Sequence, residues 1–250
     1  MEKGSYEKII SKKEFSDLPK LDVEKIYGLY SKRQVCEEEK IRLTRDMLRK
    51  VYSAFTSSKV LNPKIIEKKS PAEILKKHIS TRERFDSYEK IYSLLLKGRE
   101  TVFDLGAGIN GLSFEFFPKG VSYFGVEAVG QMVDLMNAYF SKENLKAEAF
   151  KGSLYDLEFI SNLINKGRGK KVVFLFKALD SLEMVERNYS KKLLKEIVPL
   201  VEKVVVSFAT ESLVSRKKFS VKRYWFENFV HENFNVTEDF ILGGERYICF

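Results

Sequence analysis

The sequence predicts an α/β protein: a doubly wound, seven-stranded sheet that ends in an antiparallel hairpin and follows a smaller all-helical region. Three observations support this. After residue 100, short β-rich runs alternate with helical segments. Residues 235–250 form two strand-like runs around Gly243-Gly244, and residues 1–97 show helical periodicity with almost no strand-like run. We therefore expect a helical domain over residues 1–97 and a sheet domain over residues 98–250.

The first part of the chain carries clear helix signals. An apolar face recurs in the stretch 37–55, formed by Ile41, Leu43, Leu48, Val51 and Phe55. Basic side chains occupy another face, at Arg42, Arg45 and Arg49. Further on, Ser70 can cap a helix, Pro71 suits its first position and Glu73 completes a capping box.

Five β-rich runs in the second part predict parallel strands that are buried on both faces. They are TVFDLG (101–106), SYFGVEA (122–128), AEAFKG (147–152), KVVFLFKAL (171–179) and EKVVVSFAT (202–210). Because helical segments separate these runs, we expect right-handed crossover connections between the strands.

Composition excludes several classes of protein. The chain has 250 residues, and its hydrophobic fraction of 44% is enough for a sizeable core. Since no apolar run approaches the ~18 residues of a membrane span and the N-terminus is polar, we expect a cytoplasmic protein without a membrane contact. Its two cysteines, Cys36 and Cys249, lack metal spacing, so we expect neither a disulfide nor a bound metal.

The net charge of +9 is unevenly distributed. Residues 1–97 hold 23 Lys and Arg against 15 Asp and Glu, whereas residues 98–250 hold 21 against 20. Within the second part, residues 215–223 contribute five cations and no acid. This distribution is compatible with a lysine-rich surface, or with a face that binds a polyanion such as RNA.

The loop VFDLGAGINGL (102–112) has the glycine spacing G-x-G-x-x-G at Gly106, Gly108 and Gly111. Such a turn holds the pyrophosphate of a dinucleotide in one class of proteins and S-adenosylmethionine (SAM) in another, or serves only as a tight turn. Glu127, at the end of the next strand, can bind ribose hydroxyls in either class and does not discriminate.

Three features favour SAM. Asp104 places an acid two residues before Gly106, near the expected cationic methionine end of the cofactor. The first strand follows about 100 helical residues, whereas dinucleotide folds tend to begin near the N-terminus. The C-terminal hairpin is typical of the Rossmann-like sheet of class I SAM methyltransferases.

Four stretches resemble one family of these enzymes. HISTRER (78–84), LGAGINGL (105–112), FLFKALDSLE (174–183) and SFATESL with YWFE (207–213, 224–227) are similar to motifs of the aminoglycoside-resistance ribosomal RNA guanine-N7 methyltransferases. Their order and spacing agree from about residue 70 to the end. The chain departs from the family at Ala107, where cysteine is usual, and at Gly111, Asp180 and Ala209, where proline is usual.

The resemblance implies a set of cofactor contacts. Arg84 would clasp the methionine carboxylate, with Thr81 and His78 holding its segment in place. The backbone at Gly106, Ala107 and Gly108 would approach the cofactor, and Asn110 would bond nearby or cap the next helix. Glu127 would bind the ribose, and Ser153 and Leu154 would contact the adenine. Asp156 would assist there or serve only as a helix-start acid, and Lys177 would face cofactor or RNA.

The resemblance also implies that structured RNA is the substrate, ribosomal RNA first and transfer RNA as the alternative. Guanine N7 has an unprotonated lone pair, so methylation needs no catalytic base, and the sequence shows no acid–base constellation. We expect Arg216, Lys217, Lys218, Lys222 and Arg223 to bind phosphates together with Arg42, Arg45 and Arg49. Tyr224, Trp225 and Phe226 are the candidates to stack on a flipped base. A noncatalytic RNA-binding protein on the same scaffold stays open.

Overall fold

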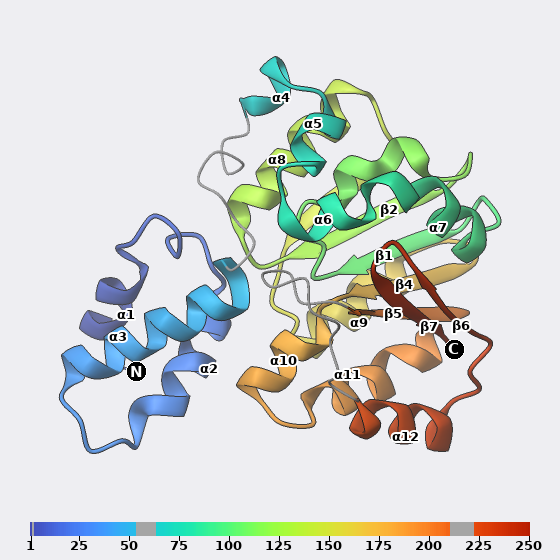
Figure 1. The fold of residues 1–250 in the computed structure, drawn as a ribbon. Coiled ribbons are helices and arrows are strands. Elements are labelled where there is room, and N and C mark those ends of the chain that lie inside the picture. Colours follow the sequence, from blue (N-terminus) through green and yellow to red (C-terminus); the bar gives the residue numbers. More distant parts are fainter. Residues whose placement is uncertain (2, 54–63, 211–222) are drawn as a thin grey trace.

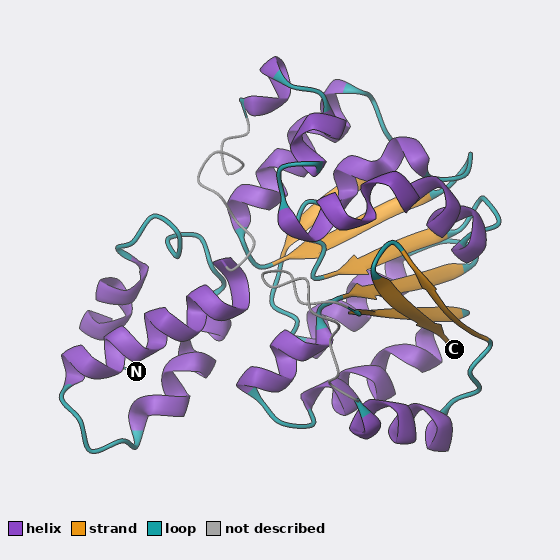
Figure 2. Ribbon diagram, viewed as in Figure 1, coloured by secondary structure: helices purple, strands orange, loops and turns teal. Residues whose placement is uncertain are grey.

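The computed structural model describes residue 1 and residues 3–53, 64–210 and 223–250. Its centre is one seven-stranded sheet in the order β3-β2-β1-β4-β5-β7-β6 (Figures 1 and 2). Strands β1 to β5 are parallel, and β7 pairs antiparallel with both β5 and β6. The predicted fold class is confirmed.

The strands lie within the runs that the sequence predicts. They span Thr101–Leu105 (β1), Ser122–Glu127 (β2), Ala147–Lys151 (β3), Lys171–Phe176 (β4), Lys203–Ala209 (β5), Glu238–Leu242 (β6) and Glu245–Cys249 (β7). β1 is buried along its whole length, since it has neighbours on both edges and helices on both faces. Because β1, β2 and β4 are parallel, their carboxyl ends lie at the same edge of the sheet.

Helices cover both faces of the sheet (Figure 1). One face carries α5 (Pro71–Leu75), α6 (Ile79–Arg84), α7 (Tyr88–Leu95) and α8 (Gly130–Lys142), with the short α4 (Ile65–Lys68) beside α8. The other carries α9 (Leu157–Lys166), α10 (Leu179–Val185), α11 (Tyr189–Ile197) and α12 (Tyr224–Asn233). The predicted capping box at Ser70 and Glu73 is present at the start of α5.

The first helices form a lobe beside the sheet (left in Figure 1). We call this the N-terminal lobe; it comprises α1 (Lys3–Ile10), α2 (Lys20–Ser31), α3 (Glu37–Leu48) and a π-helical turn, η1 (Arg49–Ser53). Ion pairs fasten it to the sheet region, from Asp17 to Lys151 at 2.7 Å and from Lys25 to Glu186 at 2.5 Å. α2 and η1 also pack against α10.

The segment after the glycine loop is a 3₁₀ helix, η3 (Asn110–Phe116), where an α-helix usually follows such a turn. In a 3₁₀ helix, side chains three residues apart lie above one another. Phe114 of η3 and Phe117, which directly follows it, place their ring centroids 5.5 Å apart. Of the helices that the structure describes, none has both the length and the apolar character needed to cross a membrane.

Candidate functional site

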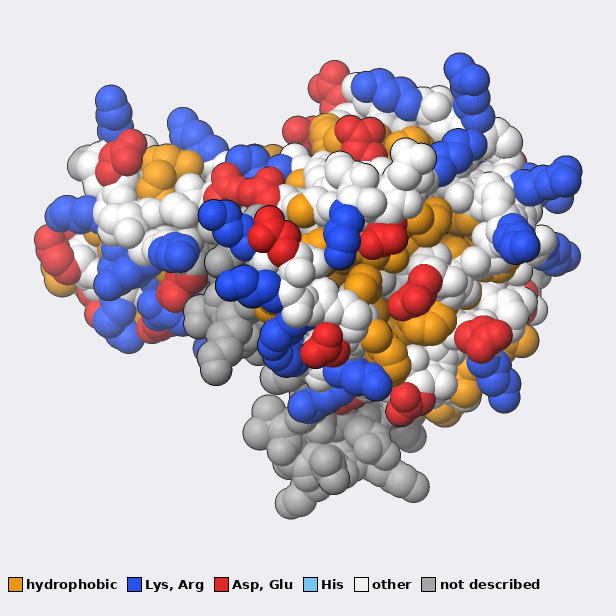
Figure 3. Space-filling model, turned by 90° about the horizontal axis from the view of Figure 1, so that it is seen from above, with side chains coloured by type: hydrophobic (Ala, Val, Ile, Leu, Met, Phe, Trp, Pro, Cys, Tyr) orange, Lys and Arg blue, Asp and Glu red, His pale blue; other side chains and the backbone are white. Residues whose placement is uncertain are grey.

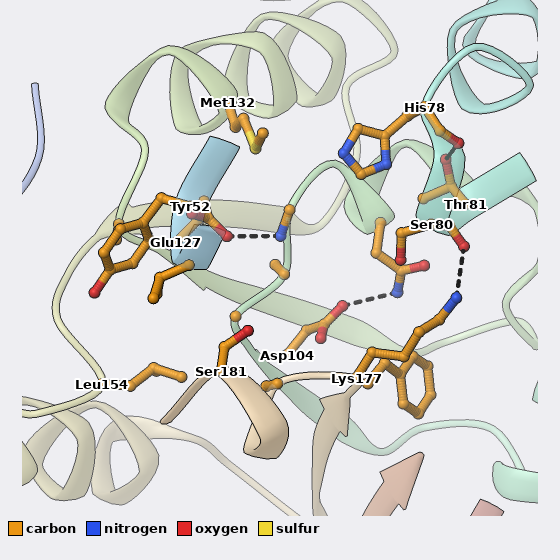
Figure 4. Close-up of a pocket in the computed structure, with 18 of the residues that line it drawn as sticks. Tyr52, His78, Ser80, Thr81, Asp104, Glu127, Met132, Leu154, Lys177 and Ser181 are labelled. Carbon is orange, nitrogen blue, oxygen red and sulfur yellow. Dashed lines mark hydrogen bonds between the residues drawn. The ribbon is translucent and has the colours of Figure 1, made fainter. Parts of the chain in front are cut away.

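A cleft opens at the carboxyl ends of β1, β2 and β4, with about 920 Å³ of space that includes its open mouth (Figure 4). Its walls come from the sheet, from α6 and from the N-terminal lobe. The polar side chains that line it are those of Asp22, Tyr52, His78, Ser80, Thr81, Arg84, Asp104, Asn110, Glu127, Lys177 and Ser181.

The glycine loop enters the cleft in a conformation that suits glycine. Gly106 and Gly108 have positive φ angles of 76° and 56°. The loop amides are already paired: those of Gly106 and Ala107 donate to the Val126 carbonyl at 2.9 and 3.0 Å, and that of Gly108 donates to Glu127 at 2.8 Å. A pyrophosphate needs such amides unpaired at an α-helix N-terminus, so this geometry argues against a dinucleotide.

Asp104 lies beneath this loop and is 1% exposed. Its Oδ2 accepts hydrogen bonds from Asn110 Nδ2 at 2.8 Å and from the Tyr123 hydroxyl at 2.9 Å. Its Oδ1 has no hydrogen-bond partner among the described residues, and burial raises its pKa. Asn110 accepts from the Tyr88 hydroxyl at 2.9 Å, so it links Asp104 to α7 and does not cap a helix.

Arg84 reaches the cleft from the last turn of α6 and is 2% exposed. Its Nε lies 3.0 Å from Glu245 Oε1, while its two Nη atoms make only long contacts, 3.4 Å to Asn110 and 3.3 Å to Ser80. Burial acts to lower its pKa, but the Glu245 carboxylate raises it above the ordinary value, so the guanidinium is charged. The Nη edge is the part best placed for a ligand carboxylate.

Lys177 stands beside Arg84 at the end of β4. Its Nζ lies 2.9 Å from Glu83 and 2.9 Å from Glu245, whose other oxygen accepts from the Ser207 hydroxyl at 2.7 Å. The C-terminal hairpin, which supplies Glu245, thus places a buried carboxylate between the two cations of the cleft.

His78 and Thr81 flank this cation pair. The Thr81 hydroxyl donates to the Leu75 carbonyl at 2.6 Å, which ties α6 to α5. His78 is 4% exposed, and neither ring nitrogen has a hydrogen-bond partner in the described part of the chain. Burial, followed by the charges of Arg84 and Lys177, lowers its pKa to about 4, so its ring is neutral.

Sequence reasoning missed the contribution of the N-terminal lobe. Asp22 from α2, together with Val51 and Tyr52 from η1, lines the cleft. A weak signal was present, because Asp22 shares a helix face with the buried Ile26 and Tyr30, where an acid is unexpected. That these residues line the same cleft as the glycine loop, which lies about 50 to 85 residues further along the chain, follows only from the tertiary structure.

Comparison with known proteins identifies the family. The profile described as ribosomal RNA methyltransferase (FmrO) matches residues 23–232. The chain belongs to this family. The resemblance drawn from the sequence motifs is thereby confirmed, while a search of curated proteins finds no match.

Solved structures of rRNA methylases share the fold of this FmrO-family chain. The 16S rRNA methyltransferase RmtF, in complex with S-adenosyl-L-homocysteine, aligns with a TM-score of 0.80 and 18% identity over 100% of this chain and 98% of its own. An rRNA methylase from Escherichia coli gives 0.78 and 18% over 98% and 97%. The 16S rRNA methylase RmtB gives 0.77 and 16% over 98% and 96%.

Two of the residues expected at the adenine do not line the cleft of this FmrO-family protein. The Ser153 hydroxyl accepts from the Tyr155 amide at 3.0 Å, and Asp156 accepts from the Phe159 amide at 3.0 Å as the N-cap of α9. Neither belongs to the lining, whereas Leu154 does. Asp156 therefore fits the alternative of a helix-start acid. No group of three potential metal ligands occurs within the described ranges.

Two of the three arginines expected to bind RNA through the N-terminal lobe are engaged with acids in this structure. Arg42 pairs with Glu39 at 2.6 Å, and Arg49 pairs with Glu14 at 2.8 Å. Arg45 contacts the Lys8 carbonyl and the Ser11 hydroxyl. Basic and acidic side chains are interspersed on the face of the N-terminal lobe that Figure 3 shows (left).

The C-terminal cluster is only partly described. Arg223 binds Asp180 through two nitrogens, at 3.0 and 2.7 Å, and is mostly buried. Arg216, Lys217, Lys218 and Lys222 lie outside the described residues. Among the aromatic candidates, Phe226 is wholly buried against Phe208 and cannot stack on a base, which corrects that expectation. Trp225 is partly buried, and Tyr224 is 55% exposed.

Proposed function

We propose that this protein methylates the N7 atom of a guanine in ribosomal RNA, with SAM as the methyl donor. The coarser statement, a SAM-dependent ribosomal RNA methyltransferase, follows from membership of the FmrO family. The observation that carries the cofactor part of this proposal is the gathering of unpaired, buried polar atoms and a charged Arg84 in one cleft beside the glycine loop. Leaving such atoms unpaired is costly, and a polar ligand would satisfy them.

The contacts of the cleft suggest how the cofactor lies. The Nη edge of Arg84 suits the methionine carboxylate, and the unpaired Oδ1 of Asp104 suits the methionine ammonium. Glu127 keeps both oxygens bonded to backbone amides, yet each has a second lone pair for a ribose hydroxyl. Leu154 and Met132 offer apolar contact to the adenine. RmtF, of similar fold, was solved with S-adenosyl-L-homocysteine.

SAM supplies a methyl group on a cationic sulfur, which a lone pair can attack in line. Guanine N7 presents such a lone pair at neutral pH, so the protein has no proton to remove before attack. Its task is to align nucleophile, methyl and sulfur, and positioning alone supplies large accelerations. The cleft is consistent with a reaction that needs only alignment: the His78 ring is neutral, and the acids of the cleft are assigned to the cofactor.

We further propose that residues 1–97 contribute the RNA-recognition part and residues 98–250 the SAM-binding methyltransferase domain. The excess of Lys and Arg before residue 98 supports the first assignment. The cleft supports the second, although it draws Arg84 and Asp22 from the first part. The two parts therefore share the cofactor site.

The test incubates the protein with methyl-labelled SAM and, separately, small ribosomal subunits, naked ribosomal RNA and transfer RNA. Borohydride and aniline treatment then cleaves the strand at N7-methylguanine. We expect label and a single scission in ribosomal RNA. Label without scission would refute the N7 assignment. Label in transfer RNA alone would show that transfer RNA, and not ribosomal RNA, is the substrate. An Arg84→Ala variant that incorporates as much label as the wild type would show that Arg84 does not bind the cofactor and would refute the proposed site.

A further inference from the structure

One carboxylate in the cleft has no task in the proposed chemistry. Asp22, on α2, is 1% exposed, and its Oδ1 accepts a hydrogen bond from the Tyr52 hydroxyl. Its Oδ2 has no hydrogen-bond partner within the part of the chain that the structure describes. Burying an unpaired carboxylate oxygen is costly, so a ligand donor is the natural partner for it.

The position of Asp22 along the cleft follows from its neighbours. Figure 4 shows Tyr52, Glu127 and Leu154 on one side of the glycine loop, and His78, Ser80 and Lys177 on the other. Burial raises the pKa of Asp22, and hydrogen bonding with the hydroxyls of Ser153, next to Leu154, and of Tyr52 acts to lower it. Asp22 thus lies at the Glu127 end, opposite the cation pair of Arg84 and Lys177.

The proposed orientation of the cofactor places adenosine at this end. Glu127 is assigned to the ribose, Leu154 and Met132 are apolar, and the Tyr52 hydroxyl already donates to Asp22. Asp22 is therefore the side chain at this end that can accept a hydrogen bond from the edge of the adenine. The only hydrogen-bond donor that the base offers there is its exocyclic 6-amine. A carboxylate accepts from such a donor, whereas it repels a carbonyl oxygen at the same place.

We propose that Asp22 Oδ2 accepts a hydrogen bond from the adenine 6-amine of the cofactor. This inference rests on the proposed function, because it requires that the cleft binds SAM. The N-terminal lobe then recognises the cofactor base directly, and α2, fastened to Glu186 and Tyr155 through Lys25, completes a site that the sheet region forms only in part.

The test measures by calorimetry how the wild type and Asp22→Asn bind two ligands, S-adenosylhomocysteine and S-inosylhomocysteine, in which an oxygen replaces the 6-amine. A hydrogen bond to a charged group contributes about 1.5–3 kcal/mol, so we expect the wild type to prefer S-adenosylhomocysteine roughly 10- to 100-fold. The asparagine amide can donate to the oxygen, so D22N should lose or reverse this preference. If the substitution only disturbed the cleft in general, it would weaken the binding of both ligands by the same factor and leave the ratio of the two affinities unchanged.

A wild type that binds both ligands equally overturns the inference, as does a D22N variant that keeps the wild-type ratio. In both cases the binding of S-adenosylhomocysteine leaves the proposed function intact. Failure of the wild type to bind S-adenosylhomocysteine refutes the proposed function and this inference with it. Should D22N not fold, Tyr52→Phe removes the hydroxyl that orients Asp22; a reduced ratio supports the contact, and an unchanged ratio overturns it.

Discussion

Three buried side chains that line one cleft, Asp22, His78 and Asp104, carry polar atoms without a hydrogen-bond partner among the described residues, although they come from separate elements of the chain. Such atoms are rare in folded proteins, because each costs about 1–3 kcal/mol when it lacks a partner. Around them, Glu245 and Asn110 hold Arg84 and Asp104 in fixed orientations. At this scale the unpaired atoms lower the stability of the folded protein, and a polar ligand in the cleft would satisfy them.

The burial of His78 makes the stability of the folded protein depend on pH. Its pKa is about 4 in the folded protein, against 6.5 for an ordinary histidine. Between these values the unfolded chain binds more protons, so stability falls as the pH drops from about 6.5 toward 4. Between pH 7.5 and 5.5 the loss attributable to His78 should be about 1.4 kcal/mol.

Urea unfolding at the two pH values, on the wild type, His78→Gln and His231→Gln, checks this expectation. His231 is exposed on α12, so H231Q should keep the wild-type loss, whereas H78Q should show a smaller one. An H78Q variant with the full wild-type pH dependence would show that burial does not hold His78 neutral.

At the scale of elements, the parallel strands were predictable because short β-rich runs alternate with helical segments, and the hairpin because Gly243-Gly244 separates its two runs. The 3₁₀ form of η3 was not, because it depends on rings from several elements packing around it. The same packing explains Gly111, where the family has proline. A Cβ at this position would lie 2.7 Å from Phe140 Cζ and 2.9 Å from Met136 Sδ.

Gly111→Ala should therefore destabilise the protein, by about 1–3 kcal/mol as for other overpacked cores. Gly28→Ala is the matched control. Gly28 is exposed within α2, and a Cβ there meets nothing within 4 Å, so alanine should stabilise the helix by roughly 0.5–1 kcal/mol. Thermal unfolding of both variants measures the difference. Equal stability of G111A and G28A would contradict the packing around η3.

At the scale of the whole molecule, the cleft is shared by the sheet, by α6 and by the N-terminal lobe. Sequence motifs located Arg84, Asp104, Glu127 and the glycine loop, since each lies within a local pattern. They could not locate Asp22 or Tyr52, whose place depends on how the lobe docks through Asp17 and Lys25. Nor could they show that Arg42, Arg49 and Arg223 bind acids of the same chain, because ion-pair partners are set by packing.

The central claim is that the cleft binds SAM with its carboxylate on Arg84. Calorimetry with S-adenosylhomocysteine and with 5′-methylthioadenosine, which lacks the carboxylate, tests it most directly on the wild type, Arg84→Ala and Arg84→Lys. We expect the wild type to favour S-adenosylhomocysteine strongly, R84A to lose that preference while still binding 5′-methylthioadenosine, and R84K to lie between, since lysine keeps the charge without the fork. An R84A variant that retains the wild-type preference for S-adenosylhomocysteine would contradict the claim.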